Sequence, residues 1–426
     1  MNKSIWENYL NKKNYPKVES NLETDVLVIG AGITGIMIAR KLHDHNIKTV
    51  LVDKNTIASG NTLFTTAHLT VQHETLYQDL SYKKRLKYLS LNKKSLNELI
   101  ELSKIIDFDF EYADSTLFSS NEKIIHKEYE VLKALGEDVY LNENIPLFIN
   151  STGISFKNQG MINPIKLTNH LVDGLDIYEH SEIVKIKKNY AILKNNKIIK
   201  FKKVIIATHY PIINKSNFLF MKLIKHKSFV VVIKYKKFKG TYCSIDQGGM
   251  YFRNYQDYLI IGGNDRKTGC KCETEFREKI CKLFNLKSDD ILYSYSATDC
   301  ITLDGIPYIG YSNLFNKRII IATGFNFWGF TWANAASNII LKIITEKKVN
   351  KLTKPNRLIL NLNLLKNIYT SIINLISFKK PRCSHLGCNL IYNKEEKIYE
   401  CPCHGSIYSS DGKVLQGPAS KDVKTP

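Results

Sequence analysis

The chain lacks the long apolar stretches that membrane insertion and export require. None of its 426 residues belongs to a run of about 18 uncharged apolar residues, so we expect no transmembrane helix. The nearest case, residues 358–377, is interrupted by asparagines and a lysine, and we interpret it as an amphipathic helix between domains. The first residues, MNKSIWENYL, lack the apolar core of a secretory signal. These features predict a cytoplasmic protein.

The chain also lacks a localised basic patch, although its net charge is +21. Lysines are spread along the sequence, as in KYKKFKG at residues 234–240 and KNNKIIKFKK at residues 194–203. A nucleic-acid-binding protein would concentrate this charge on one element with a recognisable motif. We therefore expect no nucleic-acid partner, while peripheral contact with anionic membranes stays open.

The clearest local pattern is a dinucleotide-binding fingerprint near the start of the chain. An apolar strand at residues 25–29 is followed by Gly30, Gly32 and Gly35 in the order G-x-G-x-x-G, and then by a helical pattern. These glycines permit a tight turn, close approach of a pyrophosphate and close packing of helix on strand. A second strand ends at Asp53, about 20 residues further on, where an acid can bind a ribose hydroxyl.

The order of the remaining elements favours FAD over NAD. A polar loop at residues 58–73 and a long helical stretch follow the first βαβ unit, where a plain NAD dehydrogenase would continue with regular βα units. Three predicted strands then end at His209, with the sequence KNNK as a turn, and a strand, glycine turn and helix return at residues 319–340. A nucleotide-binding domain split by an inserted substrate region is the layout of two-domain flavoproteins.

Two Cys-and-His clusters lie in the tail, in CSHLGC and CPCHGS. Cys383 and His385 form the first pair, and Cys401 and His404 form the second. In a Rieske centre two Cys hold one iron and two His hold the other. Structural zinc uses the same residue types. A degenerate, empty site is a further alternative, since few residues precede the first loop or follow the second and the supporting strands look truncated.

Several motifs together resemble the D-amino-acid-oxidase/glycine-oxidase family of FAD-dependent oxidoreductases. These are GAGITG with Asp53, the loop ASGNTLFTTA, and the segments IIATHYP, DGIPYIG and ATGFNFWGFT. More narrowly, the chain resembles the bacterial members with a C-terminal Rieske [2Fe-2S] domain. The resemblance implies an α/β fold in which a Rossmann-like FAD-binding domain carries an inserted antiparallel-sheet substrate domain.

The resemblance also implies domain boundaries. We expect the FAD-binding domain at 22–210 and 301–350, with a helical insertion at about 75–150. The substrate domain is expected at 211–300, a linker helix at 351–380, and a small β cluster-binding subdomain at 381–426.

The family resemblance implies the residues that hold FAD. The glycine-rich turn and Asp53 would bind the ADP half, and the other positions would contact the pyrophosphate, adenine or flavin. They are Gly30, Gly32, Gly35, Asp53, Ser59, Thr65, Thr66, Ala67, Val184, Thr208, Gly324, Phe325, Gly329, Phe330 and Thr331.

The substrate side is less defined by sequence. Arg253 matches a position that binds the substrate carboxylate in glycine-oxidase-like relatives, and its planar fork suits that task; a surface arginine on a strand is the alternative. The flavin takes the hydride, so no side-chain base is required. We interpret His73 and His209 as structural. Asn163 departs from the family pattern, which has His before the proline.

The predicted activity is FAD-dependent oxidation of an amine or amino-acid-like substrate, with electrons passing to the Rieske cluster and then to an unknown acceptor. The resemblance to respiratory Rieske proteins implies a disulfide between Cys388 and Cys403. One alternative is a glycine-oxidase-like enzyme with a vestigial or zinc-binding tail. Another is an electron-transfer or redox-sensing module without turnover.

Overall fold

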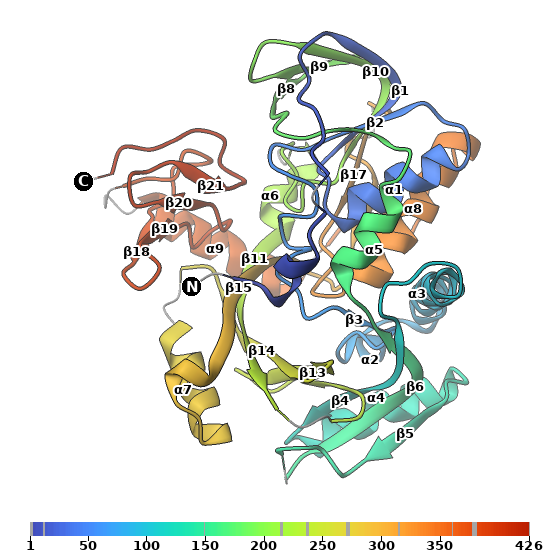
Figure 1. Ribbon diagram of the computed structural model, residues 1–426, viewed down its shortest axis with the longest axis vertical. Coiled ribbons are helices and arrows are strands. Elements are labelled where there is room, and N and C mark those ends of the chain that lie inside the picture. The colour runs from blue at the N-terminus through green and yellow to red at the C-terminus, as the bar shows by residue number, and fades with distance from the viewer. Residues whose placement is uncertain are drawn as a thin grey trace.

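The computed structural model describes residues 3–11, 13–148, 150–213, 216–235, 238–269, 273–313, 316–359, 361–376 and 381–425. Two large sheets form the body of the molecule, and a small third sheet lies at its side near the C-terminus (Figure 1). The predicted α/β fold with a small C-terminal β subdomain is confirmed. In the described ranges no helix is both long and apolar enough to span a bilayer.

The first sheet has eight strands, in the order β16-β17-β10-β1-β2-β7, with β9 joined to β10 and β8 joined to β9. Strand β1 runs parallel to β10 and β2, and β17 runs parallel to β10, as in a Rossmann-like domain. The strands are β1 (Leu22–Ile29), β2 (Thr49–Val52), β7 (Asp176–Tyr178), β8 (Ile183–Ile186), β9 (Tyr190–Leu193), β10 (Ile198–Ile206), β16 (Tyr308–Tyr311) and β17 (Ile319–Thr323).

Helices α1 (Ile33–His43), α3 (Tyr82–Ser103) and α8 (Gly329–Glu346) pack together beside this sheet (Figure 1). Most residues of α8 are buried, and many of them are small or aliphatic. Trp332 of α8 is fully buried, and its indole N–H donates to the hydroxyl of Tyr88 in α3 at 3.1 Å. This packing fixes the loop that precedes α8 over the sheet.

The second sheet has nine strands, in the order β15-β11-β14-β13-β12-β4-β6-β3, with β5 joined to β6. Its strands are β3 (His68–Leu69), β4 (Glu111–Ser119), β5 (Val139–Asn142), β6 (Thr152–Met161), β11 (Leu223–Lys234), β12 (Thr241–Ser244), β13 (Met250–Tyr255), β14 (Tyr258–Lys267) and β15 (Ile291–Thr302). The segment 75–150 was expected to be helical, yet it also supplies β4 and β5, which pair with β6 and bury Phe118 and Val139 in the hydrophobic core.

The third sheet is antiparallel and comprises β18 (Ile391–Asn393), β19 (Ile398–Glu400), β20 (Ile407–Ser409) and β21 (Val414–Gln416). We call residues 381–425 the cluster subdomain. Helix α9 (Leu362–Ile376) precedes it within the predicted linker. The other elements are η1 (Ile5–Tyr9), α2 (Leu76–Asp79), α4 (Glu122–Ala134), α5 (Pro164–Leu171), η2 (Ser216–Phe218), α6 (Leu219–Lys222), α7 (Glu273–Phe284) and η3 (Ser288–Asp290).

Candidate functional site

The turn between β1 and α1 contains two positions that accept only glycine. Gly30 has a φ of +102°, and a Cβ there would lie 2.6 Å from the carbonyl oxygen of Ala207. A Cβ on Gly35 would lie 1.8 Å from the carbonyl oxygen of Gly30, because α1 packs directly on the turn. The backbone in front of α1 is therefore open to a ligand, and the helix N-terminus favours a phosphate there.

Asp53 lies at the end of β2, beside this turn. One carboxylate oxygen accepts the N–H of Ala31 at 2.7 Å, and the other accepts the N–H of Asn55 at 2.8 Å. The hydroxyl of Thr62 accepts the first helical N–H, from Ile33, at 2.9 Å. Sequence reasoning did not single out Thr62, although it lies in the ASGNT loop and could have been found there.

A cavity of about 2150 Å³ extends from this turn along the ends of β10 and β17. Typical small-molecule pockets are about 300–1,000 Å³, so there is room for a dinucleotide and a substrate. Most of the predicted cofactor residues line it, namely Gly30, Gly32, Asp53, Ser59, Thr65, Thr66, Val184, Thr208, Gly324, Phe325, Gly329 and Phe330. Gly35, Ala67 and Thr331 are not part of the lining. The open glycine turn and the size of the cavity both fit FAD.

Thr331 and His73 form a buried contact behind the cavity wall. The hydroxyl of Thr331 lies 3.2 Å from Nε2 of His73, whose Nδ1 lies 2.7 Å from the hydroxyl of Tyr88. The ring of His73 also stacks on Trp328, with centroids 5.0 Å apart. Burial lowers the pKa of His73 to about 3. This environment agrees with a neutral, structural histidine.

His209 and His68 lie in the cavity wall itself. His209 has a φ of +61°, its carbonyl accepts the hydroxyl of Thr323, and its Nε2 lies 3.4 Å from the amide of Asn61. Burial, with the nearby charge of Lys225, lowers the pKa of His209 to about 3. Burial lowers that of His68 to about 3 as well. Both rings are therefore neutral near pH 7.

The structure does not bring Arg253 into the cavity lining. Its side chain is buried in β13 and donates to the carbonyl oxygens of Thr66 and Ile162. The guanidinium also lies over the rings of Trp6 and Tyr255, at 5.5 and 5.9 Å from their centroids. These contacts tie the Thr65–Ala67 loop to the second sheet.

Asn163, the departure from the family pattern, caps α5. Its side-chain oxygen accepts the N–H groups of Ile165 and Lys166, both at 3.1 Å. Its amide donates to the hydroxyl of Tyr255 at 2.8 Å. The asparagine therefore has a structural task as an N-cap.

Carboxylates line another part of the cavity, on the side of the second sheet. They are Glu74, Asp265 and Asp299. Burial raises the pKa of Asp265 to about 7, and the nearby charges of Glu74 and Asp299 contribute to this rise. Burial also raises the pKa of Asp299 to about 7, against the effect of Lys225. One oxygen of Asp265 is buried without a hydrogen-bond partner, so this wall can accept a hydrogen bond from a bound molecule.

The fold of the tail brings the predicted metal ligands together with Cys388 and Cys403, the other two cysteines of the tail. The ligand atoms of Cys388, Cys401, Cys403 and His404 all lie within 4.8 Å of one another. Cys383 belongs to the same buried group, and its N–H donates to the carbonyl of Cys388 at 2.8 Å. The rings of His385 and His404 lie with their centroids 5.0 Å apart.

These donors fit an iron–sulfur centre. Nδ1 of His404 is buried and has no hydrogen-bond partner, which leaves its lone pair available to a metal. The hydroxyl of Tyr408 donates to the sulfur of Cys383 at 3.3 Å, a contact that orients a ligand thiolate. Cys388 and Cys403 are free thiols in the structure, and the disulfide between them stays a prediction.

The cluster subdomain docks on the second sheet next to the cavity. The ammonium of Lys225, on β11, donates to the carbonyl oxygens of Gly417 at 2.7 Å and Gly405 at 3.3 Å. The hydroxyl of Thr268 donates to the carbonyl of Cys401 at 3.1 Å. These contacts hold both sides of the second cluster-binding loop against the body of the protein.

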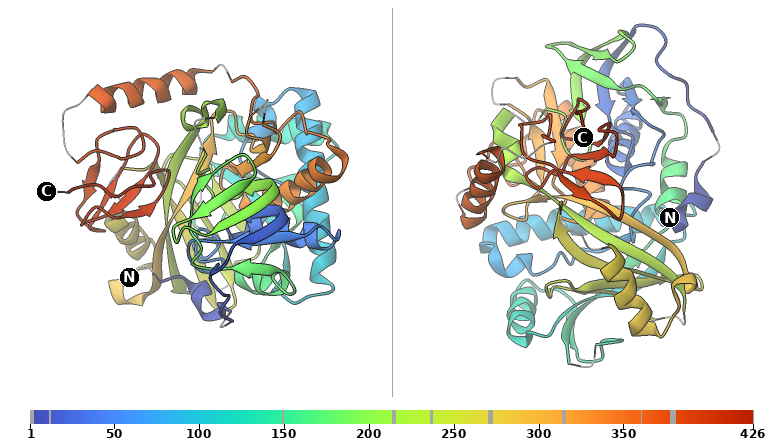
Figure 2. Two further views of the ribbon diagram at one scale, coloured as in Figure 1. Left: turned by 90° about the horizontal axis from the view of Figure 1, so that it is seen from above. Right: turned by 90° about the vertical axis from the view of Figure 1, so that its left-hand side faces the viewer.

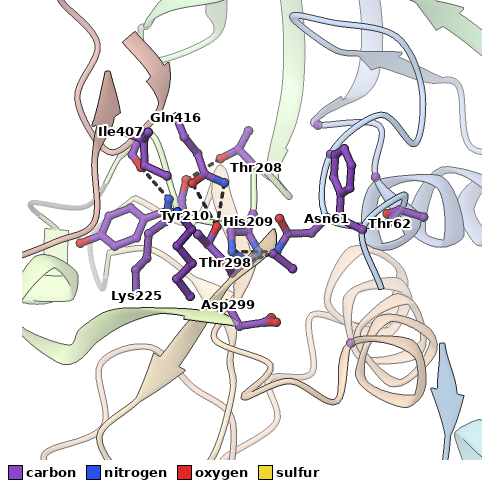
Figure 3. Close-up of a pocket in the computed structure, with 18 of the residues that line it drawn as sticks. Asn61, Thr62, Thr208, His209, Tyr210, Lys225, Thr298, Asp299, Ile407 and Gln416 are labelled. Atoms are coloured by element: carbon purple, nitrogen blue, oxygen red, sulfur yellow. Dashed lines mark hydrogen bonds between the residues drawn. The ribbon is translucent and has the colours of Figure 1, made fainter. Parts of the chain in front are cut away.

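The cavity and the cluster subdomain share a wall. Figure 3 shows Ile407 and Gln416 of the cluster subdomain on one side, Asn61 and His209 on the other, and Thr298 between them. The amide of Gln416 donates to the hydroxyl of Thr298 at 2.8 Å, and the carbonyl of Thr298 accepts the amide of Asn61. Sequence reasoning missed this connection.

A family model described as "FAD dependent oxidoreductase" matches residues 25–342. The chain belongs to this family. A second model, the Rieske [2Fe-2S] domain, matches residues 375–426. This family member is thus an oxidoreductase with FAD as its cofactor and a Rieske domain for a [2Fe-2S] cluster in its tail. The zinc interpretation of the tail is not favoured.

Individual relatives agree with this assignment. A Bacillus subtilis (strain 168) protein named as a Rieske 2Fe-2S iron-sulfur protein, YhfW, is 28% identical, and the alignment covers 99% of this chain and 97% of that protein. The cytochrome b6-f complex iron-sulfur subunit of Synechococcus sp. (strain JA-3-3Ab) is 48% identical over 42 residues, which is 10% of this chain and 24% of that subunit.

Solved structures share the fold of the flavoprotein part. L-proline dehydrogenase from P. horikoshii has a TM-score of 0.67 at 20% identity, covering 79% of this chain and 98% of that one. Glycine oxidase from Geobacillus kaustophilus has a TM-score of 0.66 at 15% identity, covering 80% of this chain and 100% of that one.

Proposed function

We propose that this chain oxidises an amine or amino-acid-like small molecule and passes the electrons through its tail to an acceptor not yet identified. The observation that carries the proposal is the shared wall: Gln416 and Ile407 line the same cavity as Gly30 and Gly324. Bound FAD supplies hydride acceptance, and a Rieske cluster supplies one-electron transfer.

The chain's own residues bind and orient the groups. Gly30, Gly32 and the N-terminus of α1 are proposed to hold the pyrophosphate, with Asp53 on the ribose, and the segment from Gly324 to Phe330 is proposed to lie beside the flavin. The predicted residues Ser59, Thr65, Thr66, Val184 and Thr208 would complete this site. In the tail, Cys383 and Cys401 are proposed to hold one iron, and His385 and His404 the other.

The cavity wall suits a substrate with an amino group. Asp265 and Asp299 offer carboxyl oxygens, and Asp265 has one oxygen without a partner. The names of the solved neighbours, which include an L-proline dehydrogenase, glycine oxidases and L-amino acid deaminases, point to the same substrate class.

The proposal is tested by anaerobic reduction of the purified chain, followed by optical and electron paramagnetic resonance spectroscopy. Amines and amino acids are screened for bleaching of the flavin absorbance, and the Rieske signal is recorded in the same samples. We expect a substrate that bleaches the flavin to elicit the cluster signal as well, whereas the C401S variant should bleach without the signal. Bleaching with no cluster signal in the wild type would contradict the electron path and leave a simple flavoenzyme.

A further inference from the structure

Helix α9 turns most of its large apolar residues away from the protein. Their side chains form a stripe along one face with exposed fractions between 48% and 73%, and the stripe consists of Leu362, Leu365, Tyr369, Ile372, Ile373 and Ile376. The helix lies along the outer edge of the molecule, as the orange-red helix at the top of the left view in Figure 2. A contiguous exposed patch of large aliphatic side chains marks a surface that binds something.

The inward side of α9 combines apolar and polar residues, and Leu364 on this side packs against a buried cluster that includes Leu219 and Leu223. Asn367 is buried, and its amide donates to the carbonyl of Met221 at 2.9 Å. The carbonyl of Asn374 accepts the N–H of Asn389 from the cluster subdomain at 3.2 Å. A helix on a water-facing surface normally turns its continuous apolar stripe towards the core, whereas the stripe of α9 is exposed. The orientation is fixed by these polar contacts, so the apolar stripe is held outward.

The sequence around α9 has charge of one sign only. From residue 347 to residue 394 it contains ten Lys and Arg residues and no Asp or Glu. Lys366 on the helix and Arg382 just after it are both exposed, and Arg382 donates to the carbonyl of Leu375 at the helix end. An apolar stripe flanked by cations is suited to the surface of an anionic lipid bilayer, where acyl chains lie below negatively charged headgroups.

We propose that α9 binds peripherally to anionic phospholipid membranes, with its axis parallel to the surface and its stripe among the headgroups and upper acyl chains. Helix α9 has 15 residues and is about 22 Å long. The hydrocarbon core of a bilayer is about 30 Å thick, so the helix would lie on the bilayer without crossing it. A second copy of the chain is a poorer occupant, because two such faces would bring Lys366 and its cationic neighbours together, and residues 347–394 contain no carboxylate to pair with them.

Membrane binding would bring the first cluster-binding loop to the surface too. A Cβ on Gly387 would lie 3.9 Å from the side chain of Leu375, so this loop rests on the end of α9. If the proposed electron path holds, its acceptor is then reached at the membrane. The binding itself does not depend on that path, and it is measured without turnover.

The test is co-sedimentation of the full-length holoprotein with vesicles, comparing phosphatidylcholine alone with mixtures that contain phosphatidylglycerol. We expect binding to the anionic vesicles, weakened by salt. The L365Q/I372Q variant, which changes only exposed positions, should lose roughly tenfold or more in partitioning. The matched control L86Q/I105Q, at an exposed position on α3 and another just after its end, should bind like the wild type. Flavin absorbance checks that every variant is folded.

Two results would overturn the proposal. One is equal, weak sedimentation with both lipid compositions and for all variants. The other is a wild-type dimer in analytical ultracentrifugation that L365Q/I372Q converts to a monomer, with no vesicle binding, since the stripe would then cover a second copy. A loss of anionic-vesicle binding in K366E, with the substrate-induced flavin bleaching unchanged, would support the membrane contact independently of the enzyme activity.

Discussion

The ammonium of Lys227 on β11 lies 2.8 Å from a carboxylate oxygen of Glu400 on β19, and both side chains are buried. Glu396 binds the same ammonium. Burial acts to lower the pKa of Lys227, but the two glutamates outweigh it and the pKa is raised. This ion pair joins the second sheet to the cluster subdomain, so the position of the tail depends on a few buried charges.

We therefore predict that K227M weakens the docking of the cluster subdomain. Removal of one partner leaves buried carboxylates without their counter-charge, which costs about 3–5 kcal/mol. Limited proteolysis of the holoprotein should release a C-terminal fragment much faster from K227M than from the wild type. The exposed pair Lys413–Asp411 provides the control, and K413M should digest at the wild-type rate. Equal digestion of all three proteins would show that the pair does not hold the tail.

The contact of Tyr408 with Cys383 predicts an effect on the reduction potential of the cluster. A hydrogen bond to a ligand sulfur stabilises the more negative, reduced state. Such a bond contributes about 0.5–1.5 kcal/mol, so Y408F should lower the potential by about 20–65 mV. Redox titration followed by electron paramagnetic resonance measures it. Tyr392, near the sheet edge, serves as the control, and an unchanged potential in Y408F would refute the role of this hydroxyl.

The glycine turn predicts a sharp contrast between two glycines of the same cavity wall. In G30A the new Cβ meets the carbonyl of Ala207 at 2.6 Å and the φ of +102° is strained, so FAD occupancy should fall by about tenfold or more. At Gly60 a Cβ meets nothing within 4 Å, and G60A should keep its flavin. The FAD occupancy of both variants is measured as the ratio of flavin to protein absorbance in the purified proteins. Full flavin in G30A would remove this turn from the FAD site.

Local patterns in the sequence predicted the parts of the site that are continuous in the chain. The turn at Gly30, the acid at Asp53 and the paired Cys and His of the tail each depend on spacing within a short segment. The contacts of Lys227 with Glu400 and of Thr298 with Gln416 join residues more than 100 positions apart, and no local pattern encodes them. Periodicity likewise indicates that α9 is amphipathic, but only its tertiary contacts determine which face points outward.

The side-chain contacts of Arg253 could not be predicted from the sequence either. They lead to a prediction that separates a structural role from a role in binding a substrate carboxylate. A carboxylate ligand would lie in the cavity, whereas its observed partners are the carbonyls of Thr66 and Ile162. We expect R253M to lower the free energy of unfolding by about 2–4 kcal/mol, since two buried carbonyls lose a charged donor. FAD occupancy should fall with it, because Thr66 belongs to the cavity wall.

The measurements for Arg253 are thermal unfolding, flavin content and the KM values of amine substrates with and without a carboxylate. The two KM values should change by the same factor in R253M. R266M, at the partly exposed arginine that pairs with Glu275, should behave as the wild type. A selective rise in KM for the carboxylate-bearing substrate would support the predicted role of Arg253 as a carboxylate ligand.

The aspartates of the cavity predict how stability depends on pH. Burial raises the pKa of Asp265 to about 7, with Glu74 and Asp299 adding to the shift, from a value near 3.9 in an unfolded chain. The folded state therefore binds more protons between about pH 4 and pH 7. The contribution of Asp265 to the stability of the folded state is fully present below about pH 4 and is lost as the pH rises through about 7.

We predict that D265N flattens this part of the pH profile. The melting temperature of the holoprotein is measured from pH 5 to pH 8. The wild type should lose more stability than D265N as the pH rises, because it must ionise both Asp265 and Asp299, whereas D265N keeps only Asp299. D257N, at an exposed position between β13 and β14, should keep the wild-type slope. If D265N and the wild type have parallel profiles, Asp265 already ionises at its ordinary pKa, and the cavity wall is charged throughout this range.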